Sequence, residues 1–270
     1  MGTMKVSCWT RKGIMLKYLL DMVKEERFKH ILKIVRKKGK VDYESLSADL
    51  NVSEDTIRRD VESLHHNGLV LRVRGGAIAP SRNPLSFEDR TKFLAEEKNT
   101  IAVKAQPLIQ DGQTIFMDGG STICAVASHL PANSSFRLVT NNMALVPIIS
   151  RYRHIELILL GGNYDRETAT NTGVQTCSEA ARYIADLYLM GTCALQKDFG
   201  ITAVFQADGE VKRSMLKNAV KTYALGNYAI FNSMAHFKVC ELNEISGLIT
   251  ELATDDRKLD EFRNLGLRLM

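Results

Sequence analysis

Apolar residues in the first part of the chain recur with the spacing of a helix. Within residues 25–39 they fall at i, i+3, i+4 and i+7, and Gly39 follows, which predicts an amphipathic helix that ends at this glycine. The apolar positions are Phe28, Ile31, Leu32 and Val35. These positions therefore predict the first helix of a small N-terminal module.

Two shorter helices are predicted directly afterwards. Asp42 can cap the first, which should end near Asn51, and Ser53 caps the second, which Gly68 closes. A tight Leu-Asn-Val-Ser turn separates them, and two short helices joined in this way form a helix-turn-helix. The second of the pair would be the recognition helix. Its inward stripe consists of Ile57, Val61 and Leu64.

The other faces of the predicted recognition helix are polar. Asp55 and Arg59 point nearly opposite to the apolar stripe, and Thr56 and Arg58 lie on its two flanks. Arginine binds guanine through two hydrogen bonds or pairs with phosphate, and a helix N-terminus favours an anion. We therefore expect these four side chains, together with Ser53 at the helix start, to contact DNA.

A basic strand is predicted after the recognition helix. In Leu-Val-Leu-Arg-Val-Arg, Arg72 and Arg74 fall on one face of the strand, and Gly75-Gly76 is expected to form a hairpin turn. A β-wing of this kind beside a helix-turn-helix is a winged-helix arrangement. Arg72, Arg74 and Gly76 are therefore expected to take part in contacts with phosphates or the minor groove.

From residue 96 onward the pattern changes to alternating strands and helices. Short apolar runs are followed by a polar or glycine-bearing loop and then by a helical stretch, which predicts a doubly wound, parallel α/β sheet. Residues 80–95, with Pro80, Pro84 and mixed charges, are expected to form the linker. Residues 96–270 are then the second domain.

Polar loops follow three successive predicted strands. Ligands of doubly wound sheets bind beyond the carboxyl ends of the strands, and a glycine-rich loop at a helix N-terminus can cradle a phosphate. We therefore expect a shared ligand site, although a glycine after a strand is often only a turn. The expected ligand-binding residues of the three loops are Asp118, Gly120, Ser121, Thr122, Thr140, Asn141, Gly161 and Gly162.

A later predicted helix begins with side chains of both charges. Lys212 or Arg213 could neutralise a phosphate, and Glu210 could accept protons from sugar hydroxyls. The alternative is an ordinary exposed helix start, where a glutamate is well placed against the helix dipole. The sequence leaves both interpretations open.

Charge divides the chain near the same place as the hydrophobic pattern. Residues 1–92 hold 19 Lys and Arg against 12 Asp and Glu, a net charge of +7, whereas the remainder carries −2. A basic module joined to a near-neutral domain suggests that the module binds a polyanion. The 5 cysteines include no Cys-x-x-Cys pair, so neither a disulfide framework nor a zinc site is expected. Without an apolar run of about 18 residues, no membrane span is expected, and we interpret the chain as cytoplasmic.

The first module resembles a known family. Arg27, Ile31 and Val35 form the pattern R-x3-I-x3-V, and S-x2-T-I-R-R-D-V follows after 17 residues, beginning at Ser53. This long match with fixed spacing resembles the DeoR-type helix-turn-helix of bacterial transcriptional regulators. The resemblance implies sequence-specific binding to operator DNA, usually by a repressor.

The same resemblance bears on where the folded chain starts. Proteins of this family tend to begin just before a helix like Glu-Glu-Arg-Phe-Lys-His-Ile-Leu, so Met22 would be a natural initiator. Residues 1–21 are then expected to be an extension without a defined fold. Residues 22–79 form the predicted winged helix-turn-helix domain.

Residues 87–251 resemble the sugar-phosphate sensor domain of the same family. The matching motifs are Asp-Gly-Gly-Ser-Thr, Val-Thr-Asn-Asn, Leu-Leu-Gly-Gly, Gly173, Ile-Thr-Ala at 201–203 and Glu-Val-Lys-Arg-Ser-Met. That sensor domain is similar to ribose-5-phosphate isomerase. The resemblance implies that a phosphorylated sugar or polyol, bound at these loops, alters DNA binding.

One stretch departs from the family pattern. Where the family tends to carry Asp-x-x-Lys-Phe, this chain has Ser233 and His236 before Phe237. A fixed cation near the effector is thereby replaced by an imidazole, which is neutral or titrates. His236 is still counted among the expected effector-binding residues, and the change indicates either an unusual effector or weaker binding.

These features together predict a DNA-binding regulator, a repressor of a carbohydrate-catabolism operon, with no cofactor and no metal. Helix-turn-helix dimers bind paired half-sites, so a homodimer or homotetramer is expected. One alternative is a sugar-phosphate isomerase or hydrolase that uses Asp118 or Glu210 as a base, which a turnover assay would detect. Another is a non-specific DNA binder, which would bind operator and random DNA equally.

Overall fold

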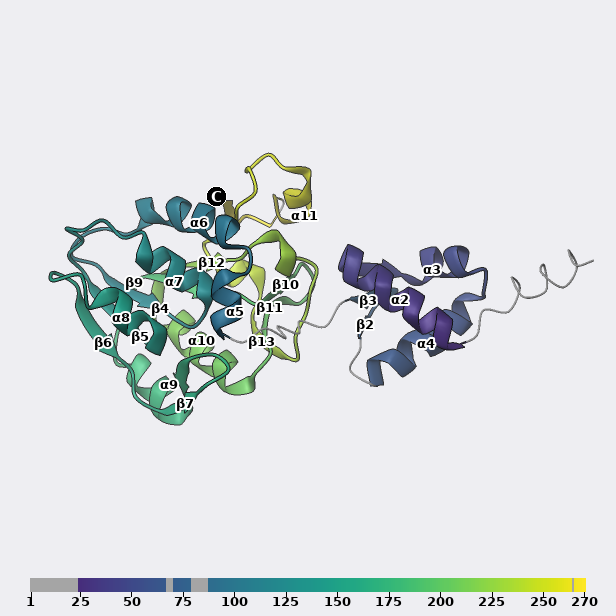
Figure 1. Ribbon diagram of the computed structural model, residues 1–270, viewed down its shortest axis with the longest axis horizontal. Coiled ribbons are helices and arrows are strands. Elements are labelled where there is room, and N and C mark those ends of the chain that lie inside the picture. The colour runs from purple at the N-terminus through teal and green to yellow at the C-terminus, as the bar shows by residue number, and fades with distance from the viewer. Residues whose placement is uncertain (1–23, 67–69, 79–86, 264) are drawn as a thin grey trace, which may run out of the picture. The chain divides into compact units, whose positions relative to one another are not determined.

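The computed structural model describes residues 24–66, 70–78, 87–263 and 265–270 and divides the chain into two compact units (Figure 1). The first unit ends at Pro80 and the second begins at Ser81. The expected N-terminal extension and Gly68 lie outside the described residues. Within those ranges, no helix is both long and apolar enough to cross a membrane.

The described part of the first unit contains three helices and a small antiparallel sheet (Figure 1). Its elements are α2 (Lys24–Lys38), β1 (Lys40–Asp42), α3 (Tyr43–Leu50), α4 (Glu54–His66), β2 (Leu71–Val73) and β3 (Gly76–Ile78). The three predicted helices are confirmed. The strand order is β1-β3-β2, and the sequence pattern does not predict β1, which consists of only 3 residues.

Local capping determines where α3 and α4 begin. The Asp42 carboxylate accepts a hydrogen bond from the Ser45 N–H at 2.7 Å, and Asn51 follows α3 in the left-handed conformation with φ 52°. The Ser53 hydroxyl accepts a hydrogen bond from the Thr56 N–H at 3.3 Å. These bonds satisfy backbone groups that a helix end leaves without partners, so both predicted N-caps are confirmed.

A buried ion pair joins α2 to α4. Arg27 Nε donates to Asp60 Oδ2 at 2.6 Å, and Arg27 Nη2 donates to the other carboxylate oxygen at 3.1 Å. Only 2% of Asp60 is exposed, and its hydrogen bond raises the pKa of Arg27. The apolar residues packed between the helices include Ile31, Val35, Leu46, Ile57, Val61 and Leu64. The signature residues Arg27 and Asp60 therefore hold the helices together.

The hairpin turn lies one residue earlier than the sequence predicts. Val73 pairs with Gly76, so Arg74 and Gly75 form the turn, with Gly75 at φ 83°. Gly76 begins β3 and is buried, and a Cβ atom on it would lie 2.0 Å from the Val41 carbonyl oxygen. The close approach of β1 therefore explains why this position is a glycine.

The second unit is built on a seven-stranded parallel sheet with the order β15-β14-β12-β9-β4-β5-β6. Its strands are β4 (Thr114–Met117), β5 (Arg137–Thr140), β6 (Glu156–Leu159), β9 (Ala185–Gly191), β12 (Ala219–Leu225), β14 (Gly247–Ile249) and β15 (Arg268–Leu269). Its helices are α5 (Phe87–Lys92), α6 (Ala95–Ala105), α7 (Ser121–Ser128), α8 (Val146–Ile149), α9 (Val174–Ala180), α10 (Gln206–Lys217) and α11 (Asp260–Arg263). The predicted α/β class is confirmed.

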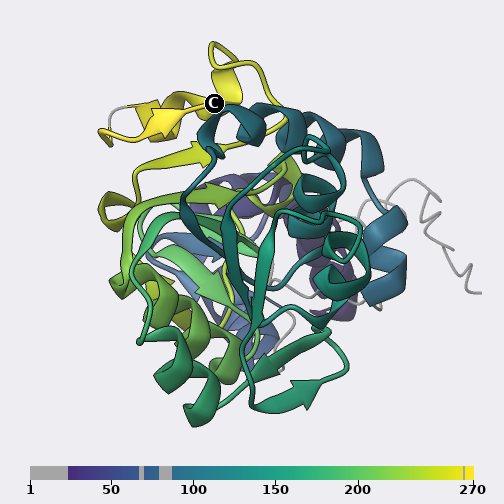
Figure 2. The same cartoon turned by 90° about the vertical axis from the view of Figure 1, so that its left-hand side faces the viewer.

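Helices cover both faces of this sheet (Figure 2). Successive side chains of a strand point to opposite faces, and the two cores follow this rule. Ile115 and Met117 of β4 pack with residues of α6 and α7, whereas Phe116 packs with residues of α10. Both faces of β4 are therefore apolar, as is usual for a strand inside a parallel sheet.

Three features of the second unit differ from the predicted alternation. The segment after β6 forms a hairpin of β7 (Asn163–Asp165) and β8 (Thr170–Thr172). A separate antiparallel sheet combines β10 (Ala194–Gln196), β11 (Gly200–Ala203) and β13 (Phe237–Cys240). Helix α5 forms inside the segment predicted as linker and packs against α7.

Candidate functional site

The outer face of α4 presents the side chains that were expected to contact DNA. Asp55, Arg58 and Arg59 are exposed, and Thr56 is half-buried. The Ser53 hydroxyl lies 2.9 Å from the Thr56 hydroxyl, so this pair stays near the helix N-terminus. Within the described residues, Arg59 has no ion-pair partner, which leaves its guanidinium available to a phosphate or a base edge.

Arg58 is held more closely than Arg59. Its guanidinium lies 3.5 Å from Glu54 and 5.4 Å from the centre of the Tyr43 ring. Exposed ion pairs of this kind contribute little stability, but together with the ring they direct the side chain toward α3. The two adjacent arginines therefore occupy different surroundings.

The wing places two further arginines on the surface. Arg72 and Arg74 are exposed, and Arg74 lies in the turn between β2 and β3. Arg72 pairs with Glu62 of α4, and this hydrogen bond raises the pKa of Arg72. The pair connects the wing to the recognition helix across their exposed sides.

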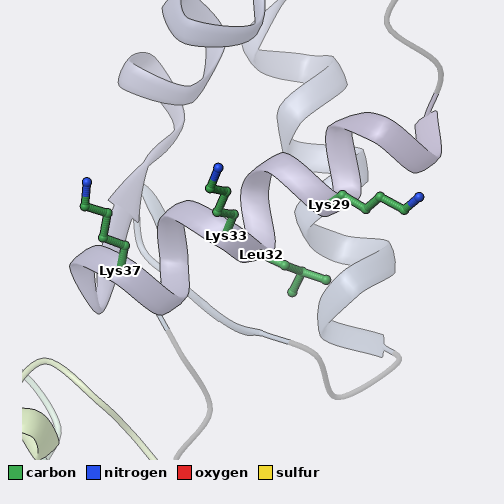
Figure 3. Close-up of a pocket in the computed structure, with 4 residues that line it drawn as sticks. All are labelled: Lys29, Leu32, Lys33 and Lys37. Carbon is green, nitrogen blue, oxygen red and sulfur yellow. The ribbon is translucent and has the colours of Figure 1, made fainter.

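Helix α2 adds a further basic surface to this unit (Figure 3). Lys29, Lys33 and Lys37 recur every four residues and are exposed, and Leu32 lies half-buried among them. Together they line a shallow hollow on the helix. A row of lysines is usually a solvated face, and its charge adds to the general attraction for a polyanion.

In the second unit, Asp118 follows β4 and is completely buried. Its carboxylate accepts hydrogen bonds from the Tyr188 hydroxyl at 2.6 Å, the Gly191 N–H at 2.7 Å and Lys212 Nζ at 2.5 Å. These donors come from β9 and α10. The structure therefore brings together Asp118 and Lys212, two of the expected ligand residues, but they bind one another.

The Lys212 ammonium lies between two carboxylates and a carbonyl. Besides Asp118 it bonds the Gly191 carbonyl oxygen at 2.9 Å and lies 3.5 Å from Asp208. Burial lowers the pKa of Lys212, but Asp118 and Asp208 raise it by more, so the net shift is upward. Burial also raises the pKa of Asp208. We call Asp118, Tyr188, Asp208 and Lys212 the buried charge cluster.

The next strand end is bonded to the same loop. The Thr140 hydroxyl donates to the Met117 carbonyl oxygen at 2.5 Å, and Asn142 Nδ2 donates to the Asp118 carbonyl oxygen at 3.0 Å. Asn141 Nδ2 donates to the Asn171 carbonyl oxygen at 2.8 Å. Its Oδ1 is buried and has no hydrogen-bond partner within the described parts of the chain.

The loop that follows Asp118 leads into α7. Gly120 precedes the helix with φ 128°, no side chain among the described residues caps its first turn, and Ser121 and Thr122 are half-buried there. A Cβ atom on Gly119 would lie 2.6 Å from Thr170 Cγ2, so the β7-β8 hairpin packs on this loop. Uncapped N–H groups and two hydroxyls at one helix start form an arrangement that suits an anion.

The glycines after β6 are explained by packing against α9. A Cβ atom on Gly162 would lie 2.1 Å from the Thr176 hydroxyl, and Gly162 has φ 132°. The Gly161 N–H donates to Glu179 at 2.7 Å. This strand end is therefore occupied by residues from the first and last turns of α9.

The remaining expected ligand residues lie apart from the buried charge cluster. Glu210 is exposed and accepts a hydrogen bond from Gln206 at 2.8 Å, as at an ordinary helix start. Arg213 donates to the Val239 carbonyl oxygen of β13 at 3.3 Å. His236 is exposed, and Ser233 donates to the Ile230 carbonyl oxygen at 2.6 Å.

Sequence reasoning does not identify Tyr188 or Asp208 as members of the cluster. Tyr188 lies within an apolar strand and has no local signal of a polar role, since only the fold places its hydroxyl beside Asp118. Asp208 is visible as an acidic residue four positions before Lys212. That spacing places the two residues on one face of a helix.

Comparison with known proteins agrees with both units. A family model described as a DeoR-like helix-turn-helix domain matches residues 27–83, and one described as the DeoR C-terminal sensor domain matches residues 94–252. The chain is 33% identical to the HTH-type transcriptional repressor GlcR of Bacillus subtilis, over 92% of this chain and 96% of that protein.

Two other similarities differ in how much of the chain they cover. The chain is 30% identical to the glycerol-3-phosphate regulon repressor of Haemophilus influenzae, over 83% of this chain and 88% of that protein. The solved ribose 5-phosphate isomerase A of Methanocaldococcus jannaschii is 15% identical over 51% of this chain and 54% of that chain, with a TM-score of 0.38. The curated relatives are named as transcriptional repressors and not as enzymes. The chain belongs to the DeoR family of transcriptional regulators.

Proposed function

We propose that this regulator represses a carbohydrate-catabolism operon and that a phosphorylated sugar or polyol, bound at the carboxyl ends of β4 and β5, controls its operator binding. The observation that carries the proposal is the loop from Asp118 to Thr122. The buried charge cluster fixes one end of this loop, and its other end is the uncapped start of α7. A relative named for the glycerol-3-phosphate regulon supports this class of effector.

The proposed DNA contacts are made by α4 and the wing. Arg59 is the residue we propose for base contact, and Ser53, Asp55, Thr56 and Arg58 flank it. Arg72 and Arg74 are proposed to contact phosphates or the minor groove. Operators of helix-turn-helix proteins have two half-sites, so the proposed DNA-bound form is a homodimer or homotetramer.

The Asp118 carboxylate is poorly suited to act as a catalytic base. It already accepts three hydrogen bonds from donors that the fold places around it. The carboxylate is also completely buried, so its hydrogen bonds go to groups of the protein and not to a substrate proton. This arrangement favours a binding role over turnover at the carboxyl edge.

Fluorescence anisotropy tests the proposal directly. The protein is titrated onto DNA from upstream of its own gene and onto random DNA, with and without a panel of sugar phosphates. We expect selective binding that one phosphorylated compound weakens, with a coupling of about 1–3 kcal/mol between the sites. Selective binding that no sugar phosphate changes would remove the proposed effector class, and equal binding to both DNAs would remove operator recognition.

A substitution in the loop tests the proposed location. Ser121→Ala removes one hydroxyl at the start of α7 and leaves the buried charge cluster unaltered. We expect unchanged operator affinity and a weaker response to the effector. A dose–response curve identical to that of the wild type would exclude this hydroxyl from the site.

A further inference from the structure

Arg90 of α5 stands out because its surroundings belong to the proposed effector site. It is half-buried, and α5 packs against α7 (Figure 1). The charged and ionisable groups within electrostatic range of Arg90 are Asp165, Glu167, Cys193, Asp208, Cys124 and Lys98. These groups belong to the β7-β8 hairpin, the segment after β9, the first turn of α10, and α7 and α6. Arg90 therefore lies near elements that also contact the Asp118–Thr122 loop or the buried charge cluster.

The guanidinium of Arg90 lies over the Phe87 ring, 5.3 Å from its centre, but its hydrogen bonding is incomplete. Its Nη2 donates to the Glu167 carbonyl oxygen, but Nε is buried and has no hydrogen-bond partner within the described ranges. No carboxylate described in the structure lies within ion-pair distance of Arg90. A guanidinium stays charged in proteins and carries five N–H donors, so a buried donor without a partner is costly.

The neighbouring buried cation is already occupied. Lys98 Nζ donates to the carbonyl oxygens of Arg90 and Phe93, where it closes the C-terminal end of α5. Lys212 is likewise held by Asp118 and Asp208. Of these three cations, Arg90 alone has a buried donor that no described group satisfies.

An acceptor that no group in the described part of the chain bonds lies at the carboxyl edge of the sheet. Asn141 Oδ1 is buried directly after β5. The Asn141 carbonyl oxygen accepts a hydrogen bond from the Asn171 N–H, and the preceding residue, Thr170, packs against Gly119. A ligand that supplies hydrogen-bond acceptors to Arg90 and a hydroxyl donor to Asn141 would satisfy both atoms. A phosphate ester of a polyol has this combination of groups, and the planar guanidinium fork matches phosphate oxygens.

We infer that Arg90 is a phosphate-binding residue of the effector site and that Asn141 Oδ1 accepts a hydroxyl of the same ligand. This inference rests on the proposed function and deepens it. The phosphate would lie between the Arg90 side chain and the start of α7. Helix α5 is the first described element after the DNA-binding unit in the chain, so the ligand contacts the element through which the chain enters the sensor.

Isothermal titration calorimetry of the full chain tests the assignment. Wild type, Arg90→Ala, Arg90→Lys and Lys92→Ala are titrated with glycerol 3-phosphate, ribose 5-phosphate, glucose 6-phosphate, fructose 1,6-bisphosphate, their unphosphorylated counterparts and inorganic phosphate. Lys92 is the matched control, because it is an exposed cation on the same helix. We expect wild type and Lys92→Ala to bind one phosphorylated compound in preference to its unphosphorylated counterpart.

The readout is the ratio of affinities for that pair of compounds. We expect Arg90→Ala to reduce the ratio at least 30-fold and Arg90→Lys to retain part of it, while operator affinity stays at the wild-type value. A purely structural role would lower the melting temperature without erasing the preference for phosphate. An unchanged ratio in Arg90→Ala overturns the inference and leaves the proposed function standing, whereas a wild type that binds no phosphorylated compound overturns both.

Asn141 is tested separately with Asn141→Ala, which removes the Oδ1 acceptor together with the amide group that donates to the Asn171 carbonyl oxygen. We expect a loss of affinity for the phosphorylated compound of about the same factor as for its unphosphorylated counterpart, so the ratio is retained. A selective loss of the phosphorylated compound would overturn the assignment of Asn141 to the hydroxyl.

Discussion

Each unit of the chain contains a buried ion pair, and the two pairs differ in their relation to function. Arg27–Asp60 lies between α2 and α4, behind the face that carries Arg59. Asp118–Lys212 lies within the proposed effector site itself. In the proposed assignment, structure and recognition are carried by different residues in the first unit, whereas in the sensor they share residues.

This difference determines which substitutions are informative. In the first unit, an exposed side chain can be removed without touching the core. In the sensor, removing Asp118 or Lys212 changes both the fold and the site, so a lost response would have two explanations. Ser121 and Arg90 are better probes of ligand binding because neither belongs to the buried charge cluster.

The largest expected effect is that of Lys212→Met. It leaves Asp118 and Asp208 buried without their cation, and breaking a buried pair costs about 3–5 kcal/mol. Denaturant unfolding followed by far-ultraviolet circular dichroism measures the loss. Lys217→Met, an exposed position on the same helix, is the control. Equal unfolding midpoints for the two variants would show that the ion pair does not support the sensor fold.

Asp60→Ala should produce a somewhat smaller effect in the first unit. Arg27 is partly solvated and can recover some hydration, so we expect a loss of about 2–4 kcal/mol. Hydrogen exchange of peptides from α2 and α4 locates the effect, and Asp49→Ala on the exposed side of α3 is the control. Faster exchange confined to the sensor peptides would contradict the assignment.

Arg59→Ala should weaken operator binding by about 1–3 kcal/mol, the range for a good arginine contact to a base. Arg58→Ala is the matched comparison, and we expect a smaller loss because Glu54 and Tyr43 already engage this side chain. Anisotropy titrations on operator DNA measure both variants. Equal affinities of Arg59→Ala and wild type would remove Arg59 from the interface.

The helix-turn-helix could be predicted because its signals are local. The Asp42 and Ser53 caps, the turn at Asn51 and the stripe through Ile57 each act within a few residues, and the structure confirms them. The predicted position of the hairpin turn is wrong by one residue, because either of two adjacent glycines is a suitable turn residue. Only the approach of β1, a contact distant in sequence, separates the roles of Gly75 and Gly76.

The candidate ligand site could be predicted only in outline. The strand-end rule located the Asp118–Thr122 loop, but the partners of Asp118 lie 70, 73 and 94 residues away. The sequence does not show whether a charged side chain already pairs with another buried group, as Lys212 does with Asp118. Arg90 was missed for a related reason, because its segment has the composition of a linker and α5 is a helix of 6 residues.

The smallest expected effect concerns the thiols of Cys124 and Cys240, which both lie in the second unit. Burial raises the pKa of Cys124 to about 11 and that of Cys240 to about 12. At pH 8 the thiolate fraction is then about one in a thousand for Cys124 and one in ten thousand for Cys240, and thiolate is the reactive form. We expect peptide mass spectrometry to show slow iodoacetamide labelling of both in the native protein. Cys124 lies in α7, so we expect the effector to slow its labelling further, whereas operator DNA alone should leave the rate unchanged. Labelling of Cys124 as fast as in the denatured protein would contradict the burial of this thiol.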